Sequence, residues 1–387
     1  MKICTTICEY NPLHFGHIKH LRFINENLKG DLTAVFLSGN FVERGEPAVL
    51  DKYLRAVHAI KGGADIVFEL PTVFATANAE IFASGAIKLI SALSGEKVLC
   101  FGTEASSTEN LYKIANLLNE EPLDFVQILK ENLKDGNSFA RARALAIKEL
   151  LPEVNENDYI KPNNVLGIEY IRAILKGSHP IKVENFKRET DYLERNLQGE
   201  NSSALAIRTA LYHGQKDGVK NAVPDFVYDD LKGLPDFSKE IIYSLINSSK
   251  EQLSGVLDCS EGLENKIKKS ILKNLSYDEL VADLKGKRYT ETRIKRILLS
   301  AMLNISKDFV FKCLNSPLYL KVLAIKKEKM DALSYLSDCK FPIITRKSDA
   351  DKLSGVAREC FEKDLLANAV YSSNTGAKIN GYEMKIV

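Results

Sequence analysis

The chain has 387 residues, 45% hydrophobic and 27% charged, a composition that excludes a disordered or fibrous protein, and its net charge of +2 favours no class of partner. Seven cysteines, an odd number without a CxxC pair, exclude a disulfide framework. Because no apolar stretch approaches the roughly 20 residues that span a bilayer, and no leader pattern opens the chain, we expect a cytoplasmic protein of two or three domains.

The first hundred residues alternate between strand and helix patterns. Short apolar runs predict strands at 3–8, 32–37, 64–70 and 97–101, and helical spacing predicts helices at 14–28, 51–61 and 78–93. Continuous apolar strands separated by helices indicate βαβ units and a parallel sheet that is covered on both faces. In such sheets ligands bind beyond the carboxyl ends of the strands. The loops at 9–17, 38–46, 71–80 and 102–104 are therefore the candidate binding segments.

Beyond residue 120 the pattern becomes mainly helical. Helices are expected at 164–175 and 202–212, with a short strand at 181–186 between them. After residue 222 the chain is helical and basic, and two further strands are expected at 320–325 and 342–345, before a helix at 351–367. We therefore predict an α/β protein, with a Rossmann-like parallel-sheet domain over 1–222 and a mainly α-helical C-terminal region over 223–387.

The segment from Glu9 to His17 follows the first predicted strand and opens the first predicted helix. The N-terminus of a helix binds anions, because its first amides are unpaired and its dipole favours negative charge. His14 and His17 are three residues apart and share one face of the first turn, so both imidazoles can donate to one phosphate. Gly16 removes a side chain where a nucleotide would approach the backbone. The segment thus predicts a phosphate site whose fixed donors stabilise phosphoryl transfer.

A metal site is the alternative for this histidine cluster, because His20 is also near in sequence. His14 and His20, however, are six residues apart and point in different directions on a helix. No cysteine or carboxylate stands at ligand spacing from them. We therefore expect no metal-ligand set here and place His20 behind the site or on the surface.

The sequence His14-Phe15-Gly16-His17 resembles the HxGH motif of the nucleotidyltransferase superfamily, which includes the class I aminoacyl-tRNA synthetases. No KMSKS-like run is present, which argues against a synthetase. The blocks ICEYNPLHFGH, SGNFVERGEPA, GADIVFELP, CFGTE and PNNVLGIEY together resemble the bacterial tRNA(Met) cytidine acetate ligases. The resemblance is strong over 1–212, and it extends over the rest only by length and general character.

This resemblance implies a two-step reaction. ATP, accompanied by Mg²⁺, activates acetate as acetyl-adenylate, and the acetyl group then passes to N4 of the wobble cytidine of elongator tRNA(Met). His14 and His17 would be catalytic. The implied ATP-binding residues are Ile7, Cys8, Glu9, Tyr10, Asn11, Pro12, Leu13, His14, Phe15, Gly16, His17, Ile18, Lys19, His20, Gly102, Asn163, Asn164 and Arg188.

Several of these roles have structural alternatives. Asn163 and Asn164 precede a predicted helix, so they can donate to a nucleotide or cap the helix. Arg188 suits a phosphate through its planar guanidinium, or it belongs to a solvated surface pair. The run from Ser203 to Arg208 resembles the Ser/Thr-x-Ile-Arg element of nucleotidyltransferases. Alanine stands at position 206, where the superfamily more often has Ser or Thr, so the role of Arg208 stays open.

Two groups of charged residues are candidates for binding acetate or RNA. Arg44, Glu46 and Arg55 follow the second strand and form either a substrate contact or a structural ion pair. Residues 285–329 hold 12 Lys/Arg and 3 Asp/Glu, a local balance of 12 − 3 = +9. That segment is either a set of solvated helix faces or an RNA surface. The predicted tRNA-binding residues are Lys285, Lys287, Arg288, Arg293 and Arg296.

Two other functions are compatible with the motif. A small-molecule adenylyl- or cytidylyltransferase of coenzyme synthesis would use the same fold, but a long basic helical half would then be unexplained. A non-catalytic RNA-binding protein with a relic nucleotide site would bind RNA without turning over ATP, and the intact HxGH motif argues against it. The sequence predicts no oligomeric state.

Overall fold

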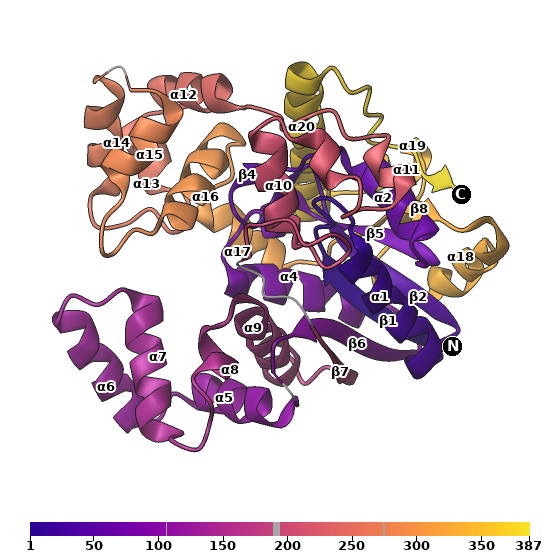
Figure 1. Ribbon diagram of the computed structural model, residues 1–387, viewed down its shortest axis with the longest axis horizontal. Helices are drawn as coiled ribbons and strands as arrows, with labels where there is room; N and C mark the ends of the chain where they lie inside the picture. Colours follow the sequence, from indigo (N-terminus) through magenta and orange to yellow (C-terminus); the bar gives the residue numbers. More distant parts are fainter. Residues whose placement is uncertain (106, 189–193, 274) are drawn as a thin grey trace.

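The computed structural model describes residues 1–105, 107–188, 194–273 and 275–387. Its strands are β1 (Lys2–Cys8), β2 (Leu32–Ser38), β3 (Phe41–Val42), β4 (Glu46–Pro47), β5 (Ile66–Leu70), β6 (Glu96–Thr103), β7 (Ile181–Lys187), β8 (Leu320–Ile325), β9 (Ile343–Ile344) and β10 (Lys385–Ile386). Every predicted strand is present, within one or two residues of the expected bounds. Figure 1 shows their arrangement.

Helices separate most of these strands. Those before residue 222 are α1 (Phe15–Phe23), α2 (Lys52–Lys61), α3 (Thr72–Ala75), α4 (Ala79–Ala92), α5 (Glu109–Glu120), α6 (Leu123–Lys134), α7 (Phe139–Leu150), α8 (Asn157–Ile160), α9 (Pro162–Lys176) and α10 (Ala204–Tyr212). Four short π or 3-10 segments are η1 (Ile24–Leu28), η2 (Lys216–Val219), η3 (Lys327–Lys329) and η4 (Leu336–Asp338).

The later helices are α11 (Asp225–Tyr228), α12 (Ser238–Asn247), α13 (Lys250–Ser254), α14 (Leu263–Ile271), α15 (Tyr277–Leu284), α16 (Glu291–Met302), α17 (Lys307–Asn315), α18 (Ala332–Tyr335), α19 (Lys347–Ala350) and α20 (Gly355–Thr375). Helices α12 to α16 pack on one another and form a separate lobe in Figure 1. We call this group the basic lobe. No described helix is long and apolar enough to cross a membrane.

The central sheet has the strand order β10-β8-β5-β2-β1-β6-β7, with β9 beside β8. Its pairs are parallel except for β5 and β8, which run antiparallel. The predicted α/β fold with a mainly parallel sheet is confirmed. The division predicted at residue 222 stays a prediction, and the sheet itself draws β8 and β10 from beyond that position.

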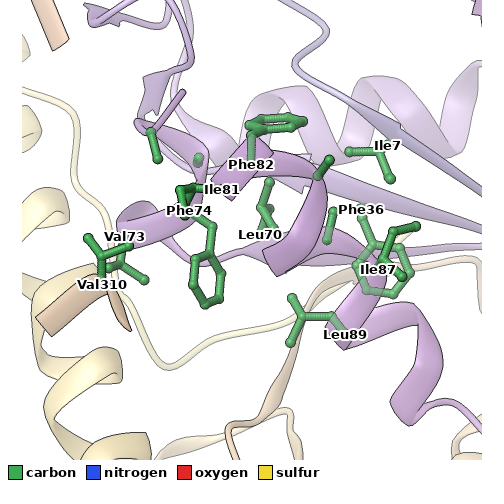
Figure 2. Packing of buried hydrophobic residues seen from close by; sticks show 14 of the residues in the cluster. Ile7, Phe36, Leu70, Val73, Phe74, Ile81, Phe82, Ile87, Leu89 and Val310 are labelled. Atoms are coloured by element: carbon green, nitrogen blue, oxygen red, sulfur yellow. The ribbon is translucent and has the colours of Figure 1, made fainter. Parts of the chain in front are cut away.

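Both faces of the sheet are covered, which explains the continuous apolar strands. Every residue of β2 is buried, and successive side chains of this strand point to opposite faces of the sheet. Phe36 packs in the core on one face, and Val35 and Leu37 pack in the core on the other. Figure 2 shows part of the first core, where Val310 of α17 lies beside Val73 of α3. Burying such side chains stabilises the fold by about 1.5–3 kcal/mol each.

Candidate active site

The loop after β1 and the N-terminus of α1 form the floor of a cavity at the carboxyl ends of the strands. The opposite wall comes from the N-terminus of α10, and the sides come from β6, β7, α4 and α9. The described residues that line it are Thr6, Ile7, Cys8, Glu9, Tyr10, Asn11, His14, Gly16, His17, Lys19, His20, Glu43, Phe82, Phe101, Gly102, Asn163, Leu166, Tyr170, Phe186, Arg188, Glu200, Asn201, Ser202, Ala204, Leu205 and Arg208. This is the place that the strand order predicts for a ligand.

His14 and His17 cap the first helix with their own side chains. His14 Nδ1 accepts from the Gly16 N–H at 3.1 Å, and His17 Nδ1 accepts from the His14 N–H at 3.3 Å. A neutral imidazole whose Nδ1 accepts carries its proton on Nε2. The capping box therefore selects the tautomer and leaves two Nε2–H donors on adjacent rings, whose centroids are 3.7 Å apart.

Burial keeps both rings uncharged. It lowers the pKa of His14 to about 3, with further lowering from Arg188 and Arg208, and it lowers the pKa of His17 well below the ordinary value. His14 is 3% exposed, and its Nε2 has no hydrogen-bond partner in the described part of the chain. A buried donor without a partner costs about 1–3 kcal/mol. A phosphate oxygen at this position would remove that cost.

Gly16 is required by the histidines themselves. A Cβ at this position would lie 2.8 Å from His14 Cε1 and 3.0 Å from His14 Nδ1, so the ring would have to move. The sequence predicted that glycine is needed at position 16 to make room for a nucleotide. The structure shows that it is needed first to make room for the imidazole of His14. The preceding loop is anchored as well, because Asn11 Oδ1 accepts from the Val49 N–H at 2.7 Å.

Two arginines from distant segments reach the same cavity. Arg188 follows β7, and its backbone N–H donates to the Thr103 carbonyl at 2.8 Å. Gly102 lies under the Arg188 side chain, because a Cβ there would be 3.3 Å from Arg188 Cδ. Arg208 Nη1 donates to the Asn11 carbonyl at 2.8 Å, which links α10 to the loop after β1. The arginine whose role the sequence left open thus joins the histidine site.

The two predicted asparagines differ in the structure. Asn164 is fully buried, accepts from the N–H groups of Glu104 and Ala105, and donates to the Asn157 carbonyl. Its side chain holds the turn after β6 and is not among the cavity-lining residues, and its predicted contact with a nucleotide stays a prediction. Asn163 does line the cavity and donates to Glu104 Oε1 at 2.6 Å.

The structure separates the predicted ATP-binding residues of the segment 7–20 into those that line the cavity and those that do not. Pro12, Leu13, Phe15 and Ile18 do not line the cavity, and Leu13 is buried in the core behind α1. His20 is neither behind the cavity nor on the surface. It lines the wall, stacks on Phe186 with ring centroids 5.1 Å apart, and lies 3.3 Å from Cys100 Sγ through Nε2.

The charged cluster after β2 is largely structural. Arg55 is fully buried and donates to the backbone carbonyls of Leu50, Glu9 and Gly39, so it braces the ends of β1 and β2. Glu46 pairs with Lys295 of α16 at 2.9 Å. Glu46 is therefore in a structural ion pair, whereas Arg55 has its structural role through backbone carbonyls.

Two of the five predicted tRNA-binding cations in the basic lobe, Arg293 and Arg296, are partly buried. Arg296 is 14% exposed and pairs with Glu43 at 2.9 Å. Arg293 donates to the Asp258 carbonyl at 2.7 Å and lies over the Tyr289 ring. Arg293 and Arg296 are thus both held by groups of the protein, and their predicted contact with tRNA stays a prediction. The exposed predicted cations are Lys285, Lys287 and Arg288.

Sequence reasoning missed the apolar wall and two carboxylates of the cavity, Glu43 and Glu200. Phe82, Leu166 and Tyr170 have helical spacing and resembled core residues, although they line the cavity. Glu43 lies in the strand-end loop 38–46 that the sequence singled out, but nothing in the sequence distinguished it from Arg44 or Glu46. The signal that the sequence offered for Glu43 was its position in a loop at the end of a strand.

Comparison with known proteins places the whole chain in one family. The family model described as HIGH Nucleotidyl Transferase matches residues 1–384. A tRNA(Met) cytidine acetate ligase from Thermoanaerobacter sp. (strain X514) is 40% identical and covers 96% of this chain and 95% of its own. One from Clostridium perfringens is 35% identical, with 98% and 97% covered.

Solved structures give the same answer for the fold. Apo Thermotoga maritima TmcAL superposes over 100% of both chains with a TM-score of 0.92 at 30% sequence identity. The same protein with bound alpha-thio ATP superposes over both whole chains with a TM-score of 0.89. The chain belongs to the HIGH nucleotidyl transferase family and, within it, to the tRNA(Met) cytidine acetate ligases, as the sequence blocks predicted.

Proposed function

We propose that this protein acetylates N4 of the wobble cytidine in elongator tRNA(Met), using ATP and acetate. The relatives carry the name of this activity. The observation that supports the chemistry most directly is the buried Nε2 of His14, which has no hydrogen-bond partner among the described residues and lies near His17 and two arginines. Such fixed donors stabilise the charge that develops on phosphate oxygens during phosphoryl transfer.

The first step forms acetyl-adenylate. An acetate oxygen attacks the α-phosphorus of ATP, and pyrophosphate leaves. The Nε2–H groups of His14 and His17 donate to the phosphate oxygens, and Arg188 and Arg208 neutralise the developing charge. Mg²⁺ would be held mainly by phosphates and water, because the described residues contain no cluster of three metal-ligating side chains.

The second step transfers the acetyl group to the exocyclic amine of cytidine. The apolar side chains of Phe82 and Leu166 give the acetyl methyl a surface away from water. The exposed cations Lys285, Lys287 and Arg288 bind the tRNA backbone, and their charge makes this binding dependent on salt. Positioning of the amine beside the mixed anhydride supplies much of the rate.

Pyrophosphate exchange into ATP tests the first step, with and without acetate and in the absence of tRNA. We expect acetate-dependent exchange in the wild type and its loss in His14→Ala and His17→Ala. The transfer step is then tested by digesting elongator tRNA(Met) after the reaction and measuring N4-acetylcytidine. If acetate supports no exchange, with or without added tRNA, the proposal is wrong, and phosphorylated coenzyme precursors become the substrates to test as acceptors of AMP.

A further inference from the structure

Acetyl transfer releases a proton from the amine, so the cavity needs a group that can accept it. This requirement rests on the proposed function. The histidines are poor candidates, because burial lowers the pKa of His14 and of His20 to about 3 and that of His17 well below its usual value. Burial also raises the pKa of the Cys8 thiol, which therefore stays protonated. The carboxylates among the described lining residues are Glu9, Glu43 and Glu200.

Geometry separates these three carboxylates. Glu200 is exposed at the edge of the cavity. Glu9 Oε1 accepts from the Glu43 N–H at 2.9 Å, so it holds the backbone of the loop after β3. Glu43 itself is 23% exposed, and in the described part of the chain only Oε1 of its carboxylate is hydrogen-bonded, to Arg296 Nη1 at 2.9 Å. Its Oε2 therefore remains available to a substrate.

We infer that Glu43 is the general base of the acetyl-transfer step. The N4 amine attacks the carbonyl carbon of acetyl-adenylate and forms the C–N bond, while the C–O bond to the adenylate breaks and AMP leaves. The proton lost by N4 passes to Glu43 Oε2 and then to water.

The electrostatic environment suits a base. Burial is the largest influence on the pKa of Glu43 and raises it, the charge of Glu9 raises it further, and Arg296 opposes both. A carboxylate with a raised pKa takes a proton more readily than one in water. Arg296 is thus a positioning residue that acts through Glu43.

The same contact joins the base to the basic lobe. Gly45, with φ +74, forms the tip of the β3–β4 hairpin, and a Cβ there would lie 2.4 Å from Arg296 N of α16. The hairpin therefore rests directly on the backbone of the lobe. Glu46 offers a matched control, because it pairs with Lys295 of the same helix at 2.9 Å but does not line the cavity.

The experiment compares Glu43→Gln with Glu46→Gln in the full-length enzyme. Acetyl-adenylate is formed from ATP and acetate, transcribed elongator tRNA(Met) is added, and acetyl transfer is followed in a single turnover from pH 5 to 9. We expect Glu43→Gln to slow transfer by about 100-fold or more and to remove its rise with pH. Acetate-dependent pyrophosphate exchange should be unchanged in both variants, and Glu46→Gln should transfer at nearly the wild-type rate.

Two results would overturn the inference: wild-type transfer by Glu43→Gln, or equal loss of exchange and transfer, which would indicate a structural role. Absence of exchange or of N4-acetylcytidine in the wild type would instead defeat the proposed function itself. If Glu43→Gln does not fold, Glu43→Asp takes its place, because it retains a carboxylate. Glu43→Asp should transfer the acetyl group more slowly than the wild type and with a different pH dependence. A pH–rate profile identical to that of the wild type would count against Glu43 as the base.

Discussion

The cavity at the strand ends and the surface of the basic lobe use their charged and polar side chains in opposite ways. In the cavity, His14 is buried and keeps an Nε2 donor without a partner in the described chain. In the lobe, Arg293 and Arg296 are held by neighbouring carbonyl and carboxylate groups of the protein. A site for a small anion depends on a few groups in fixed geometry, whereas a surface for a polyanion depends on the cations that stay exposed.

Replacing His14 should produce the largest effect and is the sharpest test of the fixed geometry. Asparagine is a good helix cap, so His14→Asn should retain much of the stability that His14→Ala loses, about 1 kcal/mol. Neither variant has the Nε2 donor, so both should lose roughly 100- to 1,000-fold in adenylation rate. Pyrophosphate exchange and urea unfolding measure the two properties separately. Restored exchange in His14→Asn would mean that the imidazole serves only as a cap.

The buried histidines should also make stability depend on pH. Their folded-state pKa values lie below the unfolded value, about 3 for His14 and His20. The unfolded state therefore binds more protons as pH falls below about 6.5, and stability is lost on acidification at about 1.4 kcal/mol per pH unit for each histidine. Urea unfolding at pH 7 and pH 5 should show a smaller loss in His14→Asn than in the wild type. An equal loss would contradict the burial of an uncharged ring.

Asn163 and Asn164 allow a comparison between a residue that lines the cavity and a residue that supports the turn beside it. Asn164→Ala leaves two backbone N–H groups and one carbonyl without their buried partner, and should destabilise the protein by about 2 kcal/mol. Asn163→Ala should change stability by less than about 1 kcal/mol but raise the KM for ATP, because Asn163 lines the cavity. Thermal unfolding and exchange kinetics separate the two. The reverse pattern would reassign nucleotide binding to Asn164.

Charge reversal on the lobe should have the smallest effect per residue. Lys287→Glu with Arg288→Glu should weaken tRNA binding by about tenfold at low salt and less at high salt, with exchange unchanged. Filter binding at two salt concentrations measures this. Lys347→Glu is the matched control, because Lys347 is 65% exposed on α19 and lies outside the lobe. Equal loss of binding and exchange would show that the charges support the fold and not the RNA.

Local sequence was sufficient for the longer strands and for the centre of the site, but not for the short strands β3, β4 and β10. The alternation of apolar runs predicted the strands and the mainly parallel sheet, because residues buried on both faces must be apolar throughout. The spacing of His14 and His17 placed both rings on one helical turn, since residues three apart are neighbours on a helix. Five short blocks were enough to predict the family.

The tertiary structure decided which distant groups meet that centre. Arg208 reaches Asn11 across 197 residues of sequence, and Glu43 meets Arg296 across 253. It also decided that Asn164 supports a turn, that Arg296 faces inward, and that β8 joins the sheet antiparallel to β5. Helix spacing and caps depend on neighbours within one turn, so a sequence displays them. The partner of a long side chain depends on how the layers pack, and that was visible only in the folded chain.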